Sequence, residues 1–546
     1  MPLASKIVGR TLRLPAPLTE DVEVEADIAV PMDDGVVLLA DRYTPRHPSL
    51  SSPMPTVLVR SPYGRKGWVG LIFGRLLAER GLQVLVQSVR GTFGSGGTFE
   101  PFDERTDGLA TLRWLREQPW HTGRIGTTGP SYMGLVQWAI ADEVDVMAPS
   151  VTASEFRNQA YGGGSISLDL ALTWLLVLDV QERRLGPVWM LQGIRRTLPR
   201  VLSSDLPVGQ LDEKVFGRAH DNFRRWLEES APDSPYWSSH DFSSNVGVGD
   251  TPVQLVGGWH DIFLPWMIED WRALRARGRE TQLIIGPGAH TSVSVQGVSS
   301  RESIAWLRAH LLGDARLVRD TPVRVFVGGG GGWRDLPDFP PPGTREAVLH
   351  LQPGGGLDAP APGADAAAAG PSRFEYDPAD PTPAVGGPML MEQRPVRDNG
   401  ALEARDDVLV FTSSPLNIDQ EAIGPVRADV FFRSSLEDTD VFVRVCDVDP
   451  DGVSRNVTDG LSRLTPGEPR RDADGVAWVQ FELWPTAHRF KRGHRVRVQV
   501  SSGAHPRYAR NPGTGESPLT AVRLVKASQE VFHDAQRPSS VTLTVV

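Results

Sequence analysis

One short segment places a serine where it could act as a nucleophile. Residues Gly129–Gly134 read Gly-Pro-Ser-Tyr-Met-Gly and lie between a strand-like run and a helix-like run. A serine on a tight strand-to-helix turn projects its hydroxyl above the sheet, and the N–H groups at the helix start can hold a developing negative charge. The segment departs from strict G-x-S-x-G, since Met133 occupies the place of the second glycine and Gly134 follows it. By itself the pattern is equally consistent with an ordinary glycine-rich turn.

The order of two further polar residues favours Ser131 as a nucleophile. One strand-like run ends shortly before Asp261, and the next strand-like run ends shortly before His290. Hydrolases with a serine on such a turn carry Ser, then Asp or Glu, then His, each after a strand. Because parallel strands end at a shared edge of the sheet, we expect the three side chains to meet there. His260 is an alternative base, but it directly precedes the acid and does not follow the next strand.

The segments around these residues alternate between strand-like and helix-like patterns. Short apolar, β-branched runs predict strands, and runs with apolar residues three and four apart predict helices. The predicted strands are Val36–Ala40, Thr56–Arg60, Leu82–Gln87, Ile125–Thr128, Val253–Gly257 and Gln282–Gly286. The predicted helices are Gly70–Arg80, Thr106–Glu117, a helix from about Met133, and Met267–Arg277. This alternation indicates an α/β domain around a largely parallel sheet.

A helical segment interrupts the alternation between about Glu155 and Ser244. Its predicted helices are Leu168–Arg184, Val188–Leu198 and Glu213–Glu229. An insertion of about 90 residues is far longer than a normal loop, so we expect a functional cap. The α/β domain is therefore predicted in two parts, 1–154 and 245–345, separated by a helical cap insertion at 155–244.

The remaining residues, 346–546, are rich in short strands. Pro353–Pro371 has almost no large apolar residue and predicts an exposed connector. Several short strands separated by turn residues follow it, which predicts a β-sandwich or jelly roll. The predicted strands are Asp407–Phe411, Arg427–Arg433, Val441–Val445, Val476–Leu483, Arg495–Ser501 and Ser540–Val545.

Composition excludes several classes of protein. The 546 residues are 40% hydrophobic and 23% charged, which fits a globular chain of about three or four domains. The net charge of −10 argues against a nucleic-acid partner, and the pair Arg195-Arg196 is interpreted as a solvated face. Cys446 is the single cysteine, which excludes an intrachain disulfide or a Cys-based zinc cluster and fits the cytoplasm. The most apolar run, Leu170–Leu178, is about half a membrane span, so no membrane partner is expected.

The chain resembles the CocE/NonD hydrolases, the family of the bacterial cocaine esterase. This family is related to X-prolyl dipeptidyl aminopeptidases and α-amino acid ester hydrolases. The resemblance implies an α/β-hydrolase domain with a helical cap insertion and a C-terminal β jelly-roll domain. It rests on motifs spread over nearly the whole chain, at Ser61–Gly64, Val89–Gly97, Gly129–Gly134, Gly258–Asp261, Gly286–His290, Gly332–Arg334, Tyr376–Pro378 and Arg537–Val541.

The resemblance implies a role for each residue of the site. Ser131 matches the nucleophile, Asp261 the acid and His290 the base of a catalytic triad. Tyr63 matches the tyrosine whose hydroxyl joins the backbone N–H of Tyr132 in the oxyanion hole.

This chain departs from the usual family pattern at two positions. Relatives usually carry an aspartate where this chain has Ser88, which affects a supporting interaction. They also carry a tryptophan where this chain has Gly288, which is expected to reshape the pocket but not the triad.

Two aromatic residues are candidates for substrate binding. Phe263 lies two positions after Asp261, where the resemblance to cocaine esterase also implies a phenylalanine near the acyl group. Trp174, in the predicted cap, is a second candidate to line the acyl pocket, with a buried core tryptophan as the alternative.

We therefore expect a serine hydrolase that cleaves small-molecule carboxylic esters through an acyl-enzyme, favours an apolar or aromatic acyl group, and needs no metal or organic cofactor. The alternative with the same triad is an X-prolyl dipeptidyl peptidase or an amidase, which needs a buried carboxylate for the substrate ammonium. Phe263 and Leu264 stand where α-amino acid ester hydrolases place acidic residues, which leaves Asp169 or Asp179 for that role. An inactive binding protein is the alternative of another class. A homodimer is a hypothesis that the sequence leaves open, as it does the natural substrate.

Overall fold

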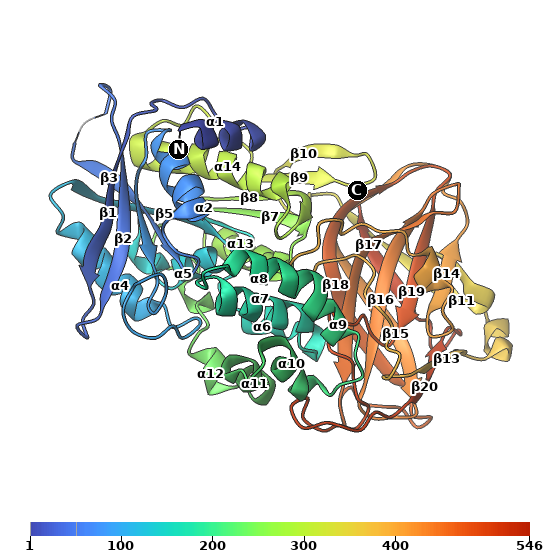
Figure 1. Ribbon diagram of the computed structural model, residues 1–546. Coiled ribbons are helices and arrows are strands. Elements are labelled where there is room, and N and C mark those ends of the chain that lie inside the picture. Colours follow the sequence, from blue (N-terminus) through green and yellow to red (C-terminus); the bar gives the residue numbers. More distant parts are fainter. Residues whose placement is uncertain (1, 51) are drawn as a thin grey trace. The chain divides into compact units, whose positions relative to one another are not determined.

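The computed structural model describes residues 2–50 and 52–546, which divide into two compact units (Figure 1). The first unit comprises the chain up to Phe156 together with Pro235–Arg324, and the second comprises Arg157–Ser234 together with Val325–Val546. Most of the predicted cap thus belongs to the same unit as the C-terminal strands. The finer boundaries at 154/155, 244/245 and 345/346 stay predictions.

The first unit is built on a mixed sheet with the strand order β1-β2-β4-β3-β5-β6-β7-β8. β1 pairs with β2, and β2 with β4, in antiparallel fashion, whereas the strands from β4 to β8 run parallel. Nearly all residues of the parallel strands are buried, as expected for strands covered on both faces. The strands are β1 (Val22–Pro31), β2 (Val37–Pro45), β3 (Met54–Ser61), β4 (Gln83–Ser88), β5 (His121–Pro130), β6 (Val146–Ser150), β7 (Val253–His260) and β8 (Thr281–Ala289).

Helices accompany the parallel strands and share their hydrophobic core. Val57, Val84 and Val146 from the strands pack with Trp306 and Leu307 from the last helix of the unit. The sequence does not predict that helix, since its first half is rich in Val and Ser, which are weak helix formers, and packing decides its structure. The helices are α1 (Pro2–Thr11), α2 to α3 (Gly67–Ala78, with η1), α4 (Arg105–Arg116), α5 (Tyr132–Trp138), α13 (Leu264–Ala276) and α14 (Val293–Leu312).

The second unit begins with helices. The predicted helix Glu213–Glu229 is wrong, because the chain breaks at Gly217, whose left-handed φ of 73° ends α10. The carboxylate of Asp212 then accepts the N–H of His220 at 2.9 Å and holds the turn before α11. The helices are α6 (Arg157–Ala160), α7 (Leu168–Val180), α8 (Gly186–Gln192), η4 (Gly193–Thr197), α9 (Leu198–Leu202), α10 (Leu211–Phe216) and α11 (Asp221–Glu228). None of the helices in the described ranges is long and apolar enough to cross a membrane.

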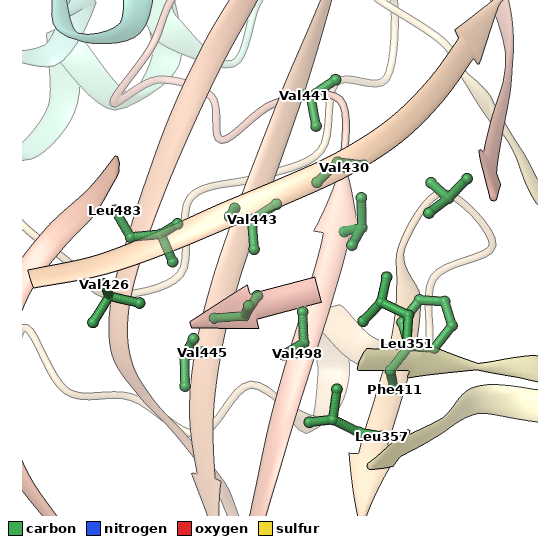
Figure 2. Close-up of a cluster of buried hydrophobic side chains, with 14 of the residues drawn as sticks. Leu351, Leu357, Phe411, Val426, Val430, Val441, Val443, Val445, Leu483 and Val498 are labelled. Atoms are coloured by element: carbon green, nitrogen blue, oxygen red, sulfur yellow. The ribbon is translucent and has the colours of Figure 1, made fainter. Parts of the chain in front are cut away.

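A mostly antiparallel β domain forms the rest of this unit. Its strand order is β13-β20-β15-β21-β11-β12-β14-β19-β16-β17, with β18 beside β15. Figure 2 shows its core, in which Val426 and Val430 of β15 pack with Val443 and Val445 of β16. The strands are β11 (Arg345–Gln352), β12 (Gly356–Asp358), β13 (Ser372–Tyr376), β14 (Leu409–Ser413), β15 (Gln420–Ser434), β16 (Thr439–Val448), β17 (Ser454–Leu464), β18 (Ala477–Phe490), β19 (Arg495–Ser501), β20 (Ala527–Phe532) and β21 (Ser540–Val545).

The sequence prediction lacks β11, β12, β13, β17 and β20, and two of these strands show the reason. Part of the predicted connector Pro353–Pro371 is β12, whose Leu357 is only 4% exposed and belongs to the core (Figure 2). Hydrogen bonds from β11 and β14 hold this short strand, so one apolar side chain is enough. β17 is not predicted because it carries Asp459, a residue that is rare in a buried strand. Here the ion pair of Asp459 with Arg444, at 2.8 Å, compensates for its burial.

Candidate active site

Three predicted site residues form a hydrogen-bonded row at the carboxyl edge of the parallel strands. Nε2 of His290 lies 3.0 Å from Oγ of Ser131, and its Nδ1 lies 3.1 Å from Oδ1 of Asp261. Asp261 and His290 are 1% and 5% exposed, whereas Ser131 is partly exposed. An imidazole held between a hydroxyl and a carboxylate can take the serine proton, and the carboxylate can then stabilise the imidazolium.

The backbone of Ser131 is strained. The residue lies between β5 and α5 and has φ 58° and ψ −126°, backbone angles that residues other than glycine rarely adopt. The N–H of Ser131 donates to the carbonyl of Ser150 at 2.9 Å, and the N–H of Gly134 donates to the carbonyl of Ser131 at 2.8 Å. Such strain persists only where the surrounding structure enforces it, and it is concentrated at functional sites.

The position of the glycines explains the departure from G-x-S-x-G. A Cβ on Gly134 would lie 2.4 Å from Cγ2 of Thr152, so this position has no room for a side chain. Met133, in contrast, points into the hydrophobic core, where it is almost fully buried. The close approach that needs a glycine therefore falls one residue later than in the strict pattern.

Asp261 and His290 come from neighbouring strands. Asp261 directly follows β7, and His290 directly follows β8, which pairs with β7 in parallel. The carboxylate oxygen of Asp261 that faces His290 also accepts the N–H of Phe263 at 2.9 Å, which orients the carboxylate. His290 is therefore the histidine that the structure brings to the Ser131 hydroxyl, as predicted from chain order.

Gly288, where relatives usually carry tryptophan, has a backbone that suits glycine. Its φ is 124°, and a Cβ there would lie 2.9 Å from Oγ of Ser292. The same hydroxyl accepts the N–H of Ala289 at 2.8 Å, just before the base. In this chain the side chain of Ser292 therefore lies beside Gly288 and binds the N–H of Ala289, which helps to position His290.

Tyr132 is anchored by a buried polar network that the sequence does not predict. Its hydroxyl donates to Oε1 of Glu104 at 2.7 Å and accepts the N–H of Phe102 at 2.8 Å. Arg60 lies 2.9 Å from the other oxygen of Glu104. Burial raises the pKa of both Glu104 and Tyr132. The only indication of this network in the sequence is the arginine that ends the predicted buried strand Thr56–Arg60.

Tyr63 follows β3, which pairs with β5, the strand that leads to Ser131. Its N–H donates to Oγ of Ser61 at 3.0 Å, and its ring lies 6.3 Å from the ring of Trp68. The structure therefore places Tyr63 and Ser131 at the ends of adjacent parallel strands.

Arg65 fixes the loop that carries Tyr63. Its Nε donates to Asp41 at 3.0 Å, and its Nη1 donates to the carbonyl of Phe93 at 2.7 Å and to the hydroxyl of Ser88 at 3.2 Å. Ser88, at the position where relatives usually carry aspartate, thus still contacts this arginine. Asp41, from β2, supplies a carboxylate instead.

The two predicted substrate-binding aromatics have different surroundings. The ring of Phe263 lies 5.7 Å from that of His290 and 6.1 Å from that of Phe156, so aromatic side chains reach the base. Trp174 belongs to the second unit, where it is buried and stacks on Trp226 at 5.9 Å. A core role therefore accounts for Trp174, and substrate binding by it stays a prediction.

Comparisons with known proteins agree with this architecture. Residues 34–292 match the model of the X-Pro dipeptidyl-peptidase (S15 family), and residues 317–542 match that of the X-Pro dipeptidyl-peptidase C-terminal non-catalytic domain. The chain is 28% identical to a cocaine esterase from Rhodococcus sp. (strain MB1 Bresler), over 96% of this chain and 98% of that protein. The structure of an α-amino acid ester hydrolase matches with a TM-score of 0.81 and 21% identity over 98% of both chains. An aminopeptidase from a marine sediment archaeon, Thaumarchaeota archaeon, matches with a TM-score of 0.79 and 22% identity over 97% of both chains. The predicted fold class, an α/β-hydrolase domain with a C-terminal β domain, is confirmed.

Proposed function

Because this chain belongs to the CocE/NonD-type serine hydrolases, whose S15 and C-terminal domain models it matches, we propose that it hydrolyses carboxylic esters with Ser131, His290 and Asp261 as its catalytic triad. The observation that carries the proposal is the hydrogen-bonded row from the Ser131 hydroxyl through both ring nitrogens of His290 to Asp261. Asp261 accepts a hydrogen bond from the Nδ1–H of His290, which holds the tautomer in which Nε2 is unprotonated and can act as the base.

The proposed reaction has two stages. Oγ of Ser131 attacks the ester carbonyl carbon while Nε2 of His290 takes the hydroxyl proton, which forms a tetrahedral intermediate. His290 then returns that proton to the leaving alcohol, and an acyl-enzyme remains on Ser131. A water molecule then loses a proton to His290 and attacks the acyl carbonyl carbon. The second tetrahedral intermediate breaks its bond to Oγ of Ser131, His290 returns the proton to that oxygen, and the carboxylic acid is released.

We assign the oxyanion hole to the hydroxyl of Tyr63 and the backbone N–H of Tyr132. Two features support the assignment besides the family resemblance. Tyr63 lies at the end of the strand next to the one that carries Ser131, and the bonds of the Tyr132 hydroxyl to Glu104 and Phe102 fix the start of α5. Donors that are held in place before reaction stabilise the developing charge without reorganisation.

The acyl group is expected to be apolar or aromatic. Phe263 faces the His290 ring, and the rings of Phe263, Phe156 and Phe102 follow one another, with 4.5 Å between the last two. An aromatic acyl group can pack against such rings, which contributes about 0.5–1.5 kcal/mol beyond burial.

The surroundings of the candidate carboxylates do not favour an X-prolyl peptidase. Asp179 pairs with both Arg183 and Arg218. Asp169 is partly buried and accepts the N–H of Leu390 at 3.1 Å, and loss of solvation raises its pKa to about 6. Each carboxylate thus has partners within the protein, and a substrate ammonium without one would carry a large desolvation penalty.

The decisive experiment compares kcat/KM for p-nitrophenyl butyrate and phenyl benzoate with that for Gly-Pro-p-nitroanilide. We expect both esters to be cleaved faster than the anilide. Ser131→Ala is the control for background hydrolysis. Faster cleavage of the anilide would establish the peptidase, and no turnover of any of the three would favour the inactive binding protein. The cytoplasmic location and the homodimer stay predictions from the sequence.

A further inference from the structure

The helical part of the second unit contains an open surface pocket of about 530 Å³, called the cavity below, at which the side chains of Arg196, Arg200 and Lys214 are exposed. This volume is within the range of about 300–1,000 Å³ that is usual for small-molecule sites. Helices α8 and α9, the η4 turn between them, the following loop and α10 form its wall. The polar side chains of that wall are Gln192, Arg196, Thr197, Arg200, Ser204 and Lys214.

The wall carries three cations and no carboxylate. Within the described ranges, Arg196, Arg200 and Lys214 each lie beyond ion-pair distance of any Asp or Glu. Two arginines in turns of the same helical segment differ, since Arg183 and Arg218 both pair with Asp179.

The positions of the cations concentrate this charge. Arg196 and Arg200 are four residues apart in one continuous helical stretch, so their side chains leave from about the same face. Lys214 is on α10, which packs against α9 (Figure 1). Like charges at this spacing destabilise a helix, and a bound anion would offset their repulsion.

The neighbouring acidic residues have other partners or surroundings. Asp212 and Glu213, on α10, both pair with Arg224. Asp205 is exposed on the loop after α9, and its charge acts on Arg510.

The floor of the cavity is tied to the β domain of the same unit. Arg510 donates to the carbonyls of Ser204 and Leu206, and the ring of His505 lies 2.6 Å from the carbonyl of Leu202. Val201 and Leu206 add an apolar side to the wall. The backbone below the cavity is thus held in place, and the wall combines cationic with apolar side chains.

We propose that this cavity binds a small phosphate ester, with the phosphate among Arg196, Arg200 and Lys214 and the organic group against Val201 and Leu206. Guanidinium groups match phosphate oxygens in bidentate geometry, and a phosphomonoester carries a charge of about −1.5 to −2 at neutral pH. Arg195 and Arg196 are both exposed, as the sequence predicts, and of the two only Arg196 lines the cavity.

The test is isothermal titration calorimetry of the full chain at low salt, with phenyl phosphate as the probe. Arg196→Gln and Lys214→Gln should each weaken binding at least about tenfold, because each removes a charge-assisted contact. Arg195→Gln is the matched control, because it removes the same charge from the adjacent exposed residue. It should change the affinity less than about twofold. Inorganic phosphate should bind more weakly than phenyl phosphate, since it lacks the organic group.

Three results would overturn the proposal. One is the absence of any binding heat with the unmodified protein at about 10 mM phenyl phosphate. Another is an equal loss of affinity in Arg195→Gln and Arg196→Gln, which would indicate diffuse surface charge. The third is equal affinity for phenyl phosphate and inorganic phosphate, which would refute the organic ligand. Circular dichroism of each variant verifies that it is folded, and none of these measurements depends on esterase activity.

Discussion

The hydroxyl of Tyr132 lies 2.7 Å from the carboxylate of Glu104, and both residues are buried. Tyr132 directly follows Ser131, so this bond is formed just beneath the strained nucleophile turn. Arg60 balances the carboxylate, and the N–H of Phe102 completes the bonds of the hydroxyl. Tyr132 thus has two separate roles. Its backbone begins α5, and its side chain holds the preceding turn in place through Glu104 and Phe102.

Tyr132→Phe should lower stability more than it lowers the rate of the chemical step. The change leaves Oε1 of Glu104 and the N–H of Phe102 without this partner, and each buried group left unpaired costs about 1–3 kcal/mol. Urea unfolding measures the loss. An unchanged free energy of unfolding would contradict the anchoring role.

Tyr63→Phe should have the opposite effect. It removes a proposed oxyanion donor and should lower kcat about 10²–10³-fold with little change in KM. Its stability should stay close to that of the unmodified protein, because Tyr63 is only partly buried. Steady-state kinetics on p-nitrophenyl butyrate decide the matter, and an unchanged kcat would make Tyr63 a packing residue.

Ser131→Ala should abolish turnover while the protein stays folded. Loss of a nucleophile that acts together with its base costs on the order of 10⁶-fold in kcat. The assay is ester hydrolysis in a preparation free of other esterases. Residual activity of more than a few per cent would exclude Ser131 as the nucleophile.

Asp261→Asn should preserve the fold and lower kcat about 10⁴-fold, as when the acid of a Ser-His-Asp triad becomes an amide. The amide presents a donor to Nδ1 of His290, which favours the wrong tautomer. The oxygen that faces Nδ1 also accepts the N–H of Phe263, so an amide can satisfy only one of these two groups, and the effect on kcat should exceed the effect on KM. A KM effect without a kcat effect would refute the triad role.

Asp270→Asn should make stability less dependent on pH. Both oxygens of Asp270 contact Ser154, and burial raises the pKa of the carboxyl from 3.8 to about 8. Between these two values the folded protein keeps a proton that the unfolded chain has released. The free energy of unfolding therefore falls as pH rises through this window and changes no further above it.

The Asp270→Asn variant has no titratable proton at this position. Its amide can form hydrogen bonds with both the N–H and the hydroxyl of Ser154. Its stability relative to the unmodified protein should therefore rise from pH 5 to pH 8, by about 4 kcal/mol if the full shift holds. Urea unfolding at the two pH values measures the difference. Asp233→Asn, at an exposed carboxylate, is the control and should show no such gain.

Much of the site was predictable because it follows from topology. Once Ser131, Asp261 and His290 each follow a strand of one parallel sheet, those strands bring them to the same edge, whatever the details of packing. The anchor beneath the site was not predictable. Arg60 and Glu104 belong to separate segments, and only folding shows that each charge has the other as its partner.

The sequence by itself determined the alternation of strands and helices, the chain order of the triad and the β-rich character of the C-terminal part, because these depend on local pattern and on the direction of strands. Tertiary structure alone decided which residues of similar type are buried, paired or exposed. Arg195 and Arg196 are adjacent and chemically identical, yet only Arg196 lines the cavity of the helical segment. Leu357, in a stretch almost devoid of large apolar residues, enters the core because neighbouring strands bind its backbone. The environment of a side chain is set by segments distant in sequence, and no local pattern contains that information.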